Sequence, residues 1–273
     1  MITLAKASFA GIVGVASLGA VGASVSYLNT LPPPETRMSA FATRLEGRSR
    51  AQRHNAELAA NSLDGRVIAP GGTFSFNNVV RGWSVDRGYV RAPVSFDGEL
   101  VPAFGGGVCQ ASTTLYNAAL LSGLTIAERH HHVFAPHYIA PGRDAAVAYP
   151  SLDLRLTNPY PFPIRLRSST NGNQLRVEVW GKKLPAERYS LVSRVLSTNS
   201  PEVVSRHIPL RPGLPAVSRR SGATGFRIVT YRVIRDPEKQ DVRRERLSDD
   251  SYPAMPGVIR YGMANGGGTR KNP

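Results

Sequence analysis

The sequence predicts an α+β fold, in which a mixed or antiparallel sheet packs around a central helix that starts at Cys109, followed by a small C-terminal β appendage. Glycine and proline are frequent, at 26 and 21 of 273 residues, which indicates many turns and short strands rather than a helical bundle. Alternating apolar and polar residues, the period of half-buried strands, recur along the chain. Apolar residues at helical spacing follow the glycines at 105–107 and predict the central helix.

Residues 1–34 form the first predicted element, a membrane anchor followed by a proline linker. Residues 7–28 have no charged side chain at neutral pH and, at about 1.5 Å per helical residue, are long enough to cross a hydrocarbon core of about 30 Å. A signal peptide cut after a small residue such as Ala23 is the alternative, but the apolar run is longer than the usual signal-peptide core. We therefore expect a membrane-anchored chain.

The body, residues 35–189, mixes helix and strand signals. Residues 50–61 predict an amphipathic helix, and Asn171-Gly172 predicts a tight hairpin turn. Strands are predicted at residues 66–69, 73–77, 89–96, 125–134, 145–149, 153–156, 164–168 and 175–180. These elements predict a single α+β domain.

A basic, β-rich appendage is predicted at residues 190–261, with a hairpin formed by residues 226–234 and 242–247. Residues 262–273 are glycine-rich and are expected to be disordered. The whole chain has 34 basic and 19 acidic side chains, a net charge of +15, which attracts anions over about 8 Å at physiological salt. Nucleic acid, anionic lipid and acidic envelope polymers are candidate partners. Nucleic acid is the least favoured, because the charge forms no single block and no nucleic-acid-binding module is recognisable.

Cys109 is the only cysteine, so no internal disulfide is possible. It follows Gly105, Gly106 and Gly107 and lies in the first turn of the predicted helix. A helix N-terminus has roughly half a positive charge, which favours a thiolate, and glycines leave amide groups accessible to an anion or oxyanion. A thiolate beside amide donors is the minimum equipment for acyl transfer. The alternative is a buried structural thiol after a plain loop.

A base for that thiol is predicted in the histidine run after the helix. If this run is a strand, His130 and His132 lie on one face and His131 on the other. Asp144 comes after a turn and could orient an imidazole. The order of Cys109, His132 and Asp144 is similar to that of transglutaminase-like cysteine enzymes. Two alternatives stay open: a zinc site formed by Cys109, His130 and His132, and a polar strand edge without chemistry.

Several motifs of the body resemble the VanW family over residues 53–181. The motifs are Pro70-Gly71-Gly72-Thr73-Phe74-Ser75-Phe76-Asn77, Gly88-Tyr89, the run 105–117 (GGGVCQASTTLYN), Glu128-Arg129-His130, Gly142-Arg143-Asp144-Ala145 and Asp153-Leu154. The family is named from accessory genes of vancomycin-resistance clusters, and its members are typically envelope proteins with an N-terminal anchor. The resemblance therefore implies a body outside the cytoplasm, in the cell envelope.

The resemblance also implies which positions matter. They are Gly106, Gly107, Cys109, Gln110, Ser112, Thr113, Tyr116, Asn117, Arg129, His132 and Asp144. From the chemistry above we expect Cys109, His132 and Asp144 to be catalytic, and the other positions, together with Gly105, to bind a ligand. This chain departs from the family pattern beside the second histidine, where His131 and Val133 replace the usual proline and serine.

Two functions are expected from these residues. The first is non-catalytic binding of peptidoglycan or another anionic wall polymer. The second is cysteine-dependent acyl transfer, or an amidase-type reaction, on cell-wall peptide. No cofactor is expected apart from the zinc alternative.

Overall fold

The computed structural model describes residues 35–96, 99–182, 187–209, 217–236, 238 and 241–263. The predicted membrane anchor lies outside these residues, as does the predicted tail beyond residue 263. Within the described part of the chain, no helix is long and apolar enough to cross a membrane.

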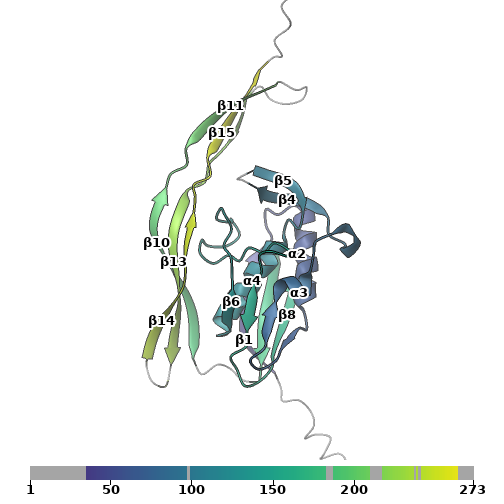
Figure 1. Ribbon diagram of the computed structural model, residues 1–273, viewed down its shortest axis with the longest axis vertical. Helices are drawn as coiled ribbons and strands as arrows, with labels where there is room; N and C mark the ends of the chain where they lie inside the picture. The colour runs from purple at the N-terminus through teal and green to yellow at the C-terminus, as the bar shows by residue number, and fades with distance from the viewer. Residues whose placement is uncertain are drawn as a thin grey trace, which may run out of the picture. The chain divides into compact units, whose positions relative to one another are not determined.

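A four-stranded antiparallel sheet forms the base of the body (Figure 1). Its strands, in spatial order, are β1 (Thr36–Arg44), β9 (Gln174–Gly181), β8 (Ile164–Thr170) and β2 (Val67–Ile68). Leu175, Val177 and Val179 of β9 are buried and alternate with less buried residues, because successive side chains of a strand point to opposite faces. The β8–β9 hairpin turns at Asn171-Gly172, as predicted.

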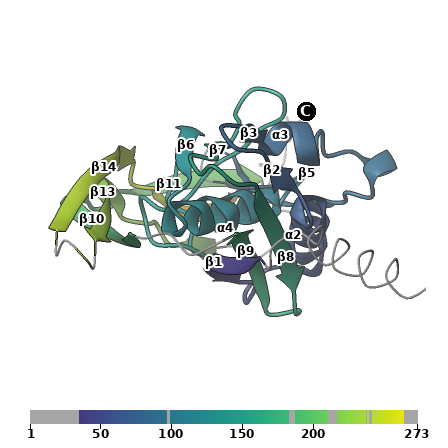
Figure 2. The same cartoon turned by 90° about the horizontal axis from the view of Figure 1, so that it is seen from below.

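Two helices cover this sheet: α2 (Arg50–Leu63) and α4 (Val108–Leu121). Ser49 caps α2 in a capping box, in which its hydroxyl accepts the Gln52 amide and the Gln52 side chain accepts the Ser49 amide. Almost every residue of α4 is buried, because the helix packs against β1 and β9 on one side and β6 on another (Figure 2).

Short elements complete the body. Strands β3 (Thr73–Ser75), β7 (Arg155–Thr157) and β6 (Thr125–Glu128) form a small antiparallel sheet. The remaining short elements are α3 (Phe76–Val80), the 3-10 turn η1 (Val85–Arg87), and the hairpin of β4 (Arg91–Phe96) and β5 (Glu99–Phe104).

Two three-stranded sheets come after the body in the chain. The first, which we call the C-terminal sheet, consists of β10 (Arg188–Asn199), β13 (Gly225–Asp236) and β14 (Asp241–Tyr252), all antiparallel. The second consists of β11 (Val203–Pro209), β15 (Gly257–Met263) and β12 (Val217–Arg220), in which β11 and β15 are parallel. The predicted tail begins too early, since residues 262 and 263 belong to β15.

The α+β prediction is confirmed in its coarse form, and four local predictions are wrong. The central helix begins at Val108, one residue before Cys109. The predicted strand 73–77 ends at Ser75, whose hydroxyl caps α3. The predicted strand 125–134 ends at Glu128, and residues 145–149 form only isolated bridges. The histidines therefore lie in a loop, and His130 and His132 do not share a strand face.

Gly107 offers a test of how tightly α4 is seated. Its φ is +110°, and a Cβ there would collide with the carbonyl oxygen of Gln52. We expect Gly107→Ala to lower the free energy of unfolding by about 3 kcal/mol or more, measured by chemical denaturation. Gly47→Ala is the matched control, because φ is +72° there and no atom lies within 4 Å, so it should cost only about 1 kcal/mol. Equal losses would show that the close packing of Gly107 contributes nothing.

Candidate active site around Cys109

The three glycines before α4 are tightly packed. A Cβ on Gly105 would collide with the indole of Trp83, and one on Gly106 would lie 2.7 Å from the Pro93 carbonyl oxygen. Together with the collision at Gly107, these contacts show that protein atoms fill the space that the missing side chains leave. The glycines therefore allow the helix start to approach its neighbours closely, and their predicted ligand role stays a prediction.

Cys109, in the first turn of α4, has a half-buried side chain that also packs against the hydrophobic core. Its thiol lies 3.4 Å from the carbonyl oxygen of Val147, and the imidazole of His132 is its neighbouring ionisable group. The hydroxyl of Tyr138 donates to the Cys109 carbonyl oxygen at 3.2 Å. These contacts differ from those of a thiol that only fills an apolar core.

His132 is held by Asp144. Nδ1 of the imidazole lies 2.6 Å from Oδ2 of Asp144, and the backbone amide of His132 donates to the same oxygen at 2.7 Å. The Asp144 side chain has no exposed surface, whereas that of His132 is 24% exposed. Because Nδ1 faces the carboxylate, Nε2 is the nitrogen available to Cys109.

The other carboxylate oxygen of Asp144 is also occupied. Oδ1 accepts the Tyr252 hydroxyl at 2.5 Å and a guanidinium N–H of Arg129 at 3.1 Å. Tyr252 in turn accepts the backbone amide of Gly142 at 3.0 Å. Asp144 thus receives four hydrogen bonds, which is how a fully buried negative charge is made tolerable.

The charges of the three groups depend on one another. Burial would raise the pKa of Asp144, but the hydrogen bond and charge of His132 and the charge of Arg129 lower it to about 2. Burial would lower the pKa of His132, but its hydrogen bonds to Asp144 and Cys109 raise it to about 10. Burial also opposes ionisation of Cys109, yet the hydrogen bond and positive charge of His132 leave the pKa of the thiol below 9.0. At neutral pH His132 is therefore an imidazolium beside the ionised Asp144, and its positive charge favours the thiolate form of Cys109.

Polar residues of α4 hold the loop that contains His132 and Asp144. Ser112 donates to the Ala145 carbonyl oxygen at 2.6 Å, and the Ala145 amide donates to Thr113 at 3.0 Å. The Asn117 side chain donates to the Arg143 carbonyl oxygen at 2.8 Å and accepts the Arg143 guanidinium at 2.9 Å. These three residues of the predicted ligand set therefore position the loop.

The remaining predicted ligand residues on α4 are also engaged with protein. Gln110 donates to Thr43 at 3.1 Å and to the Arg44 carbonyl oxygen at 2.8 Å. Tyr116 is buried, and the guanidinium of Arg129 lies 5.6 Å from the centre of its ring. A ligand role for either residue stays a prediction.

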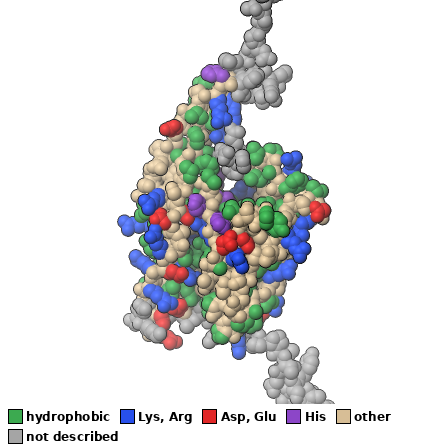
Figure 3. Space-filling model, in the orientation of Figure 1, with side chains coloured by type: hydrophobic (Ala, Val, Ile, Leu, Met, Phe, Trp, Pro, Cys, Tyr) green, Lys and Arg blue, Asp and Glu red, His purple; other side chains and the backbone are tan. Residues whose placement is uncertain are grey.

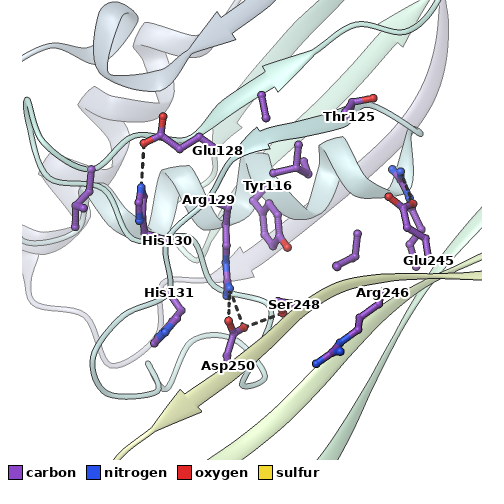
Figure 4. Close-up of a pocket in the computed structure, with 15 residues that line it drawn as sticks. Tyr116, Thr125, Glu128, Arg129, His130, His131, Glu245, Arg246, Ser248 and Asp250 are labelled. Carbon is purple, nitrogen blue, oxygen red and sulfur yellow. Dashed lines mark hydrogen bonds and ion pairs between the residues drawn. The ribbon is translucent and has the colours of Figure 1, made fainter.

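Arg129 connects the site to the C-terminal sheet. Its guanidinium donates to both oxygens of Asp250 on β14, at 2.7 and 2.8 Å, while it also binds Asp144 (Figure 4). Sequence reasoning missed the roles of Asp250 and Tyr252, since both are more than a hundred residues from their partners in the body. A two-residue spacing on one strand, which places both on one face, is the only hint they offer.

A cavity of about 590 Å³ lies between β6 and β14, and Arg129, His130, His131 and Asp250 are among its lining residues. Histidine and acidic side chains gather on the face shown in Figure 3. The lining of this cavity does not include Cys109, His132 or Asp144. The cavity therefore adjoins the candidate site on the side of Arg129 without containing the thiol.

The histidine proposed for a zinc site has a different partner. Nε2 of His130 lies 2.9 Å from Oε1 of Glu128, whereas the ring of His132 binds Asp144. Among the residues that the structure describes, no three His, Cys, Asp or Glu side chains are grouped as metal ligands would be.

Comparisons with known proteins place residues 51–180 in one family. This segment matches the family described as VanW like protein. The chain is 33% identical over 167 residues to the protein named uncharacterized protein YoaR of Bacillus subtilis, covering 61% of this chain and 55% of that protein. It is 30% identical over 145 residues to vancomycin B-type resistance protein VanW of Enterococcus faecalis, covering 51% of this chain and 52% of that protein. The chain thus spans about half the length of these relatives.

Tyr252→Phe tests the coupling between the C-terminal sheet and the site. The change removes one donor to the buried Asp144 and leaves the Gly142 amide without its acceptor. We expect the free energy of unfolding to fall by about 1–3 kcal/mol in chemical denaturation. Tyr231→Phe on the neighbouring strand β13 is the matched control and should change it by less than about 0.5 kcal/mol. Equal effects of the two changes would contradict a specific role of the Tyr252 hydroxyl.

Proposed function

We propose that the VanW-like domain, which residues 51–180 match, is a cysteine-dependent acyl-transfer or amidase-type enzyme. The observation that supports the proposal is the arrangement of Cys109, His132 and Asp144. The thiol in the first turn of α4 has an imidazole as its ionisable neighbour, and a buried carboxylate holds Nδ1 of that ring. This is the geometry by which cysteine enzymes generate and use a thiolate.

The proposed reaction begins with the thiolate–imidazolium pair. The Cys109 sulfur attacks the carbonyl carbon of an amide, and the first-turn amides of α4 stabilise the oxyanion. The C–N bond then breaks, the leaving amine takes a proton from Nε2 of His132, and an acyl thioester remains on Cys109. Water or a second amine next attacks the thioester while His132 accepts its proton. The C–S bond breaks and the thiolate–imidazolium pair returns.

Asp144 supports each step without touching the substrate. Its carboxylate fixes the His132 tautomer and stabilises the imidazolium, so His132 can release and accept a proton at Nε2. Four donors keep Asp144 ionised, and the pKa of about 2 means that it stays so over the whole physiological range. A binding site has no need of this arrangement, which is why the geometry favours catalysis over the binding function.

The substrate that we propose is a peptide or amide of the cell wall. The net charge of +15 favours an anionic envelope polymer as partner. The relative named vancomycin B-type resistance protein VanW supports a cell-wall context. In this proposal the chain is anchored in the membrane through its N-terminal segment, with its body outside the cytoplasm, and nucleic acid is not a partner.

Non-catalytic binding of peptidoglycan or another anionic wall polymer is the second candidate, and the basic charge is the observation that favours it. The two functions make different demands on the thiol. In pull-down with isolated cell wall, Cys109→Ser should be retained like the wild type whichever function holds, because the change is nearly isosteric. Only acyl transfer requires the sulfur to react.

The pH dependence of Cys109 alkylation tests the active-site arrangement. We expect iodoacetamide to modify Cys109 with a midpoint below that of an ordinary free thiol, because the His132 cation favours the thiolate. His132→Ala should move the midpoint upward, since burial then acts without the compensating charge. His54→Ala is the control, because that exposed ring on α2 bonds the Gly88 carbonyl oxygen, and it should leave the midpoint unchanged. The reaction is followed by mass spectrometry of the intact protein.

Turnover itself is tested with peptidoglycan fragments. We expect the wild type to release or exchange an amine and to form a thioester that hydroxylamine cleaves, whereas Cys109→Ala should do neither. Asp144→Asn should lower the rate strongly, by about 10⁴-fold if it acts as the orienting residue of a triad does. Ordinary slow alkylation of Cys109, with no effect of His132→Ala, would reject the enzyme and leave the binding function.

A further inference from the structure

Arg48 contacts Tyr138, which in turn contacts Cys109, the proposed nucleophile. It precedes α2 in the β1–α2 connection, and its guanidinium carbon lies 4.6 Å from the centre of the Tyr138 ring. The Tyr138 hydroxyl donates to the Cys109 carbonyl oxygen at 3.2 Å. The same ring meets the His132 ring edge-on at 6.5 Å between centres. Tyr138 thus contacts Arg48 on one side, and the backbone of Cys109 and the ring of His132 on the other.

The guanidinium of Arg48 is half-buried, and among the described residues it forms no ion pair. Burial accordingly lowers the pKa of Arg48 from its ordinary value. Two more deeply buried arginines have an acid, since Arg129 binds Asp250 and Arg232 binds Glu245. Within the described part of the chain, the half-buried Arg143 has no ion pair with an acid either, but its guanidinium donates to the Asn117 side chain. A cation taken out of water without a counter-ion is costly, so this position indicates an anion that is supplied by a ligand.

The form of the group indicates which anion fits. A guanidinium presents a planar set of donors that matches a carboxylate in two parallel hydrogen bonds, and the aromatic ring below it fixes its plane. One extended residue spans about 3.3–3.6 Å, so a substrate whose scissile carbonyl reaches Cys109 places the next residue near Tyr138 and Arg48.

We propose that Arg48, supported by Tyr138, is a substrate subsite that binds a free carboxylate within about one residue of the scissile carbonyl. The substrate class is therefore a peptide or amide with a carboxylate next to the bond that is broken. This inference rests on the proposed acyl-transfer function, because it needs Cys109 as the reacting group. Arg48 would bind the substrate, whereas Cys109 and His132 react with it.

Two alkylating reagents of the same size test the subsite. Iodoacetate is anionic and iodoacetamide is neutral, so the ratio of their rates at Cys109 reports how well the site receives a carboxylate. We expect Arg48→Gln to lower the iodoacetate-to-iodoacetamide ratio by about three- to tenfold, while the iodoacetamide rate changes by less than about twofold. Arg48→Lys should preserve more of the ratio than Arg48→Gln, because it keeps the charge.

Arg44→Gln is the matched control, since it also removes one positive charge and lies four residues away, but its side chain is 79% exposed. It should leave the ratio unchanged. An equal fall with Arg44→Gln would show a general effect of surface charge, and an equal fall in both reagents' rates with Arg48→Gln would show that Arg48 only supports the thiolate or the fold. Either result overturns the subsite. If wild-type Cys109 reacts no faster with iodoacetamide than a model thiol does, the acyl-transfer function itself fails.

Discussion

The carboxylate of Asp144 is the point on which the rest of the site depends. A fully buried negative charge is tolerable only when donors surround it, and Asp144 receives them from its own loop, from Arg129 and from Tyr252. Each of these bonds fixes a different part of the molecule. The bonds from His132 set the ring orientation and hence the environment of the thiol, and the bond from Tyr252 attaches the C-terminal sheet to the body.

The motif around Cys109 combines two roles that look alike in a sequence. The thiol faces the imidazole, whereas Ser112, Thr113 and Asn117 on the same helix bond to the backbone of the loop that presents His132 and Asp144. A buried helix with hydroxyl and amide side chains can satisfy an irregular loop that has no sheet partner for its own backbone groups. Polar residues in such a motif are therefore expected to position the loop rather than to bind a ligand directly.

Local signals in the sequence predicted the parts of the structure that local interactions determine. Helix periodicity predicted α2, and Asn171-Gly172 predicted the β8–β9 hairpin. The chain order of Cys109, His132 and Asp144 predicted which groups would meet, although their chemical role is still a proposal. The strand interpretation of the histidine run was wrong because β6 ends at Glu128 and side-chain bonds from α4 shape the loop after it. Strand β1 and the contacts of Arg48, Asp250 and Tyr252 were missed, since they depend on pairing between distant segments that leaves no periodic trace.

Strand β14 lies well beyond residue 180, where the family match ends, yet it supplies the counter-ion of Arg129 and the hydroxyl that bonds Asp144. A protein that ends at residue 180 would therefore keep every residue of the motif but lose Asp250 and Tyr252, which bind its buried side chains. It would contain an arginine that has lost one of its two acids and an aspartate that has lost one of its donors, both in the interior. The segment that matches the family is therefore shorter than the segment that supplies every partner of the buried charges.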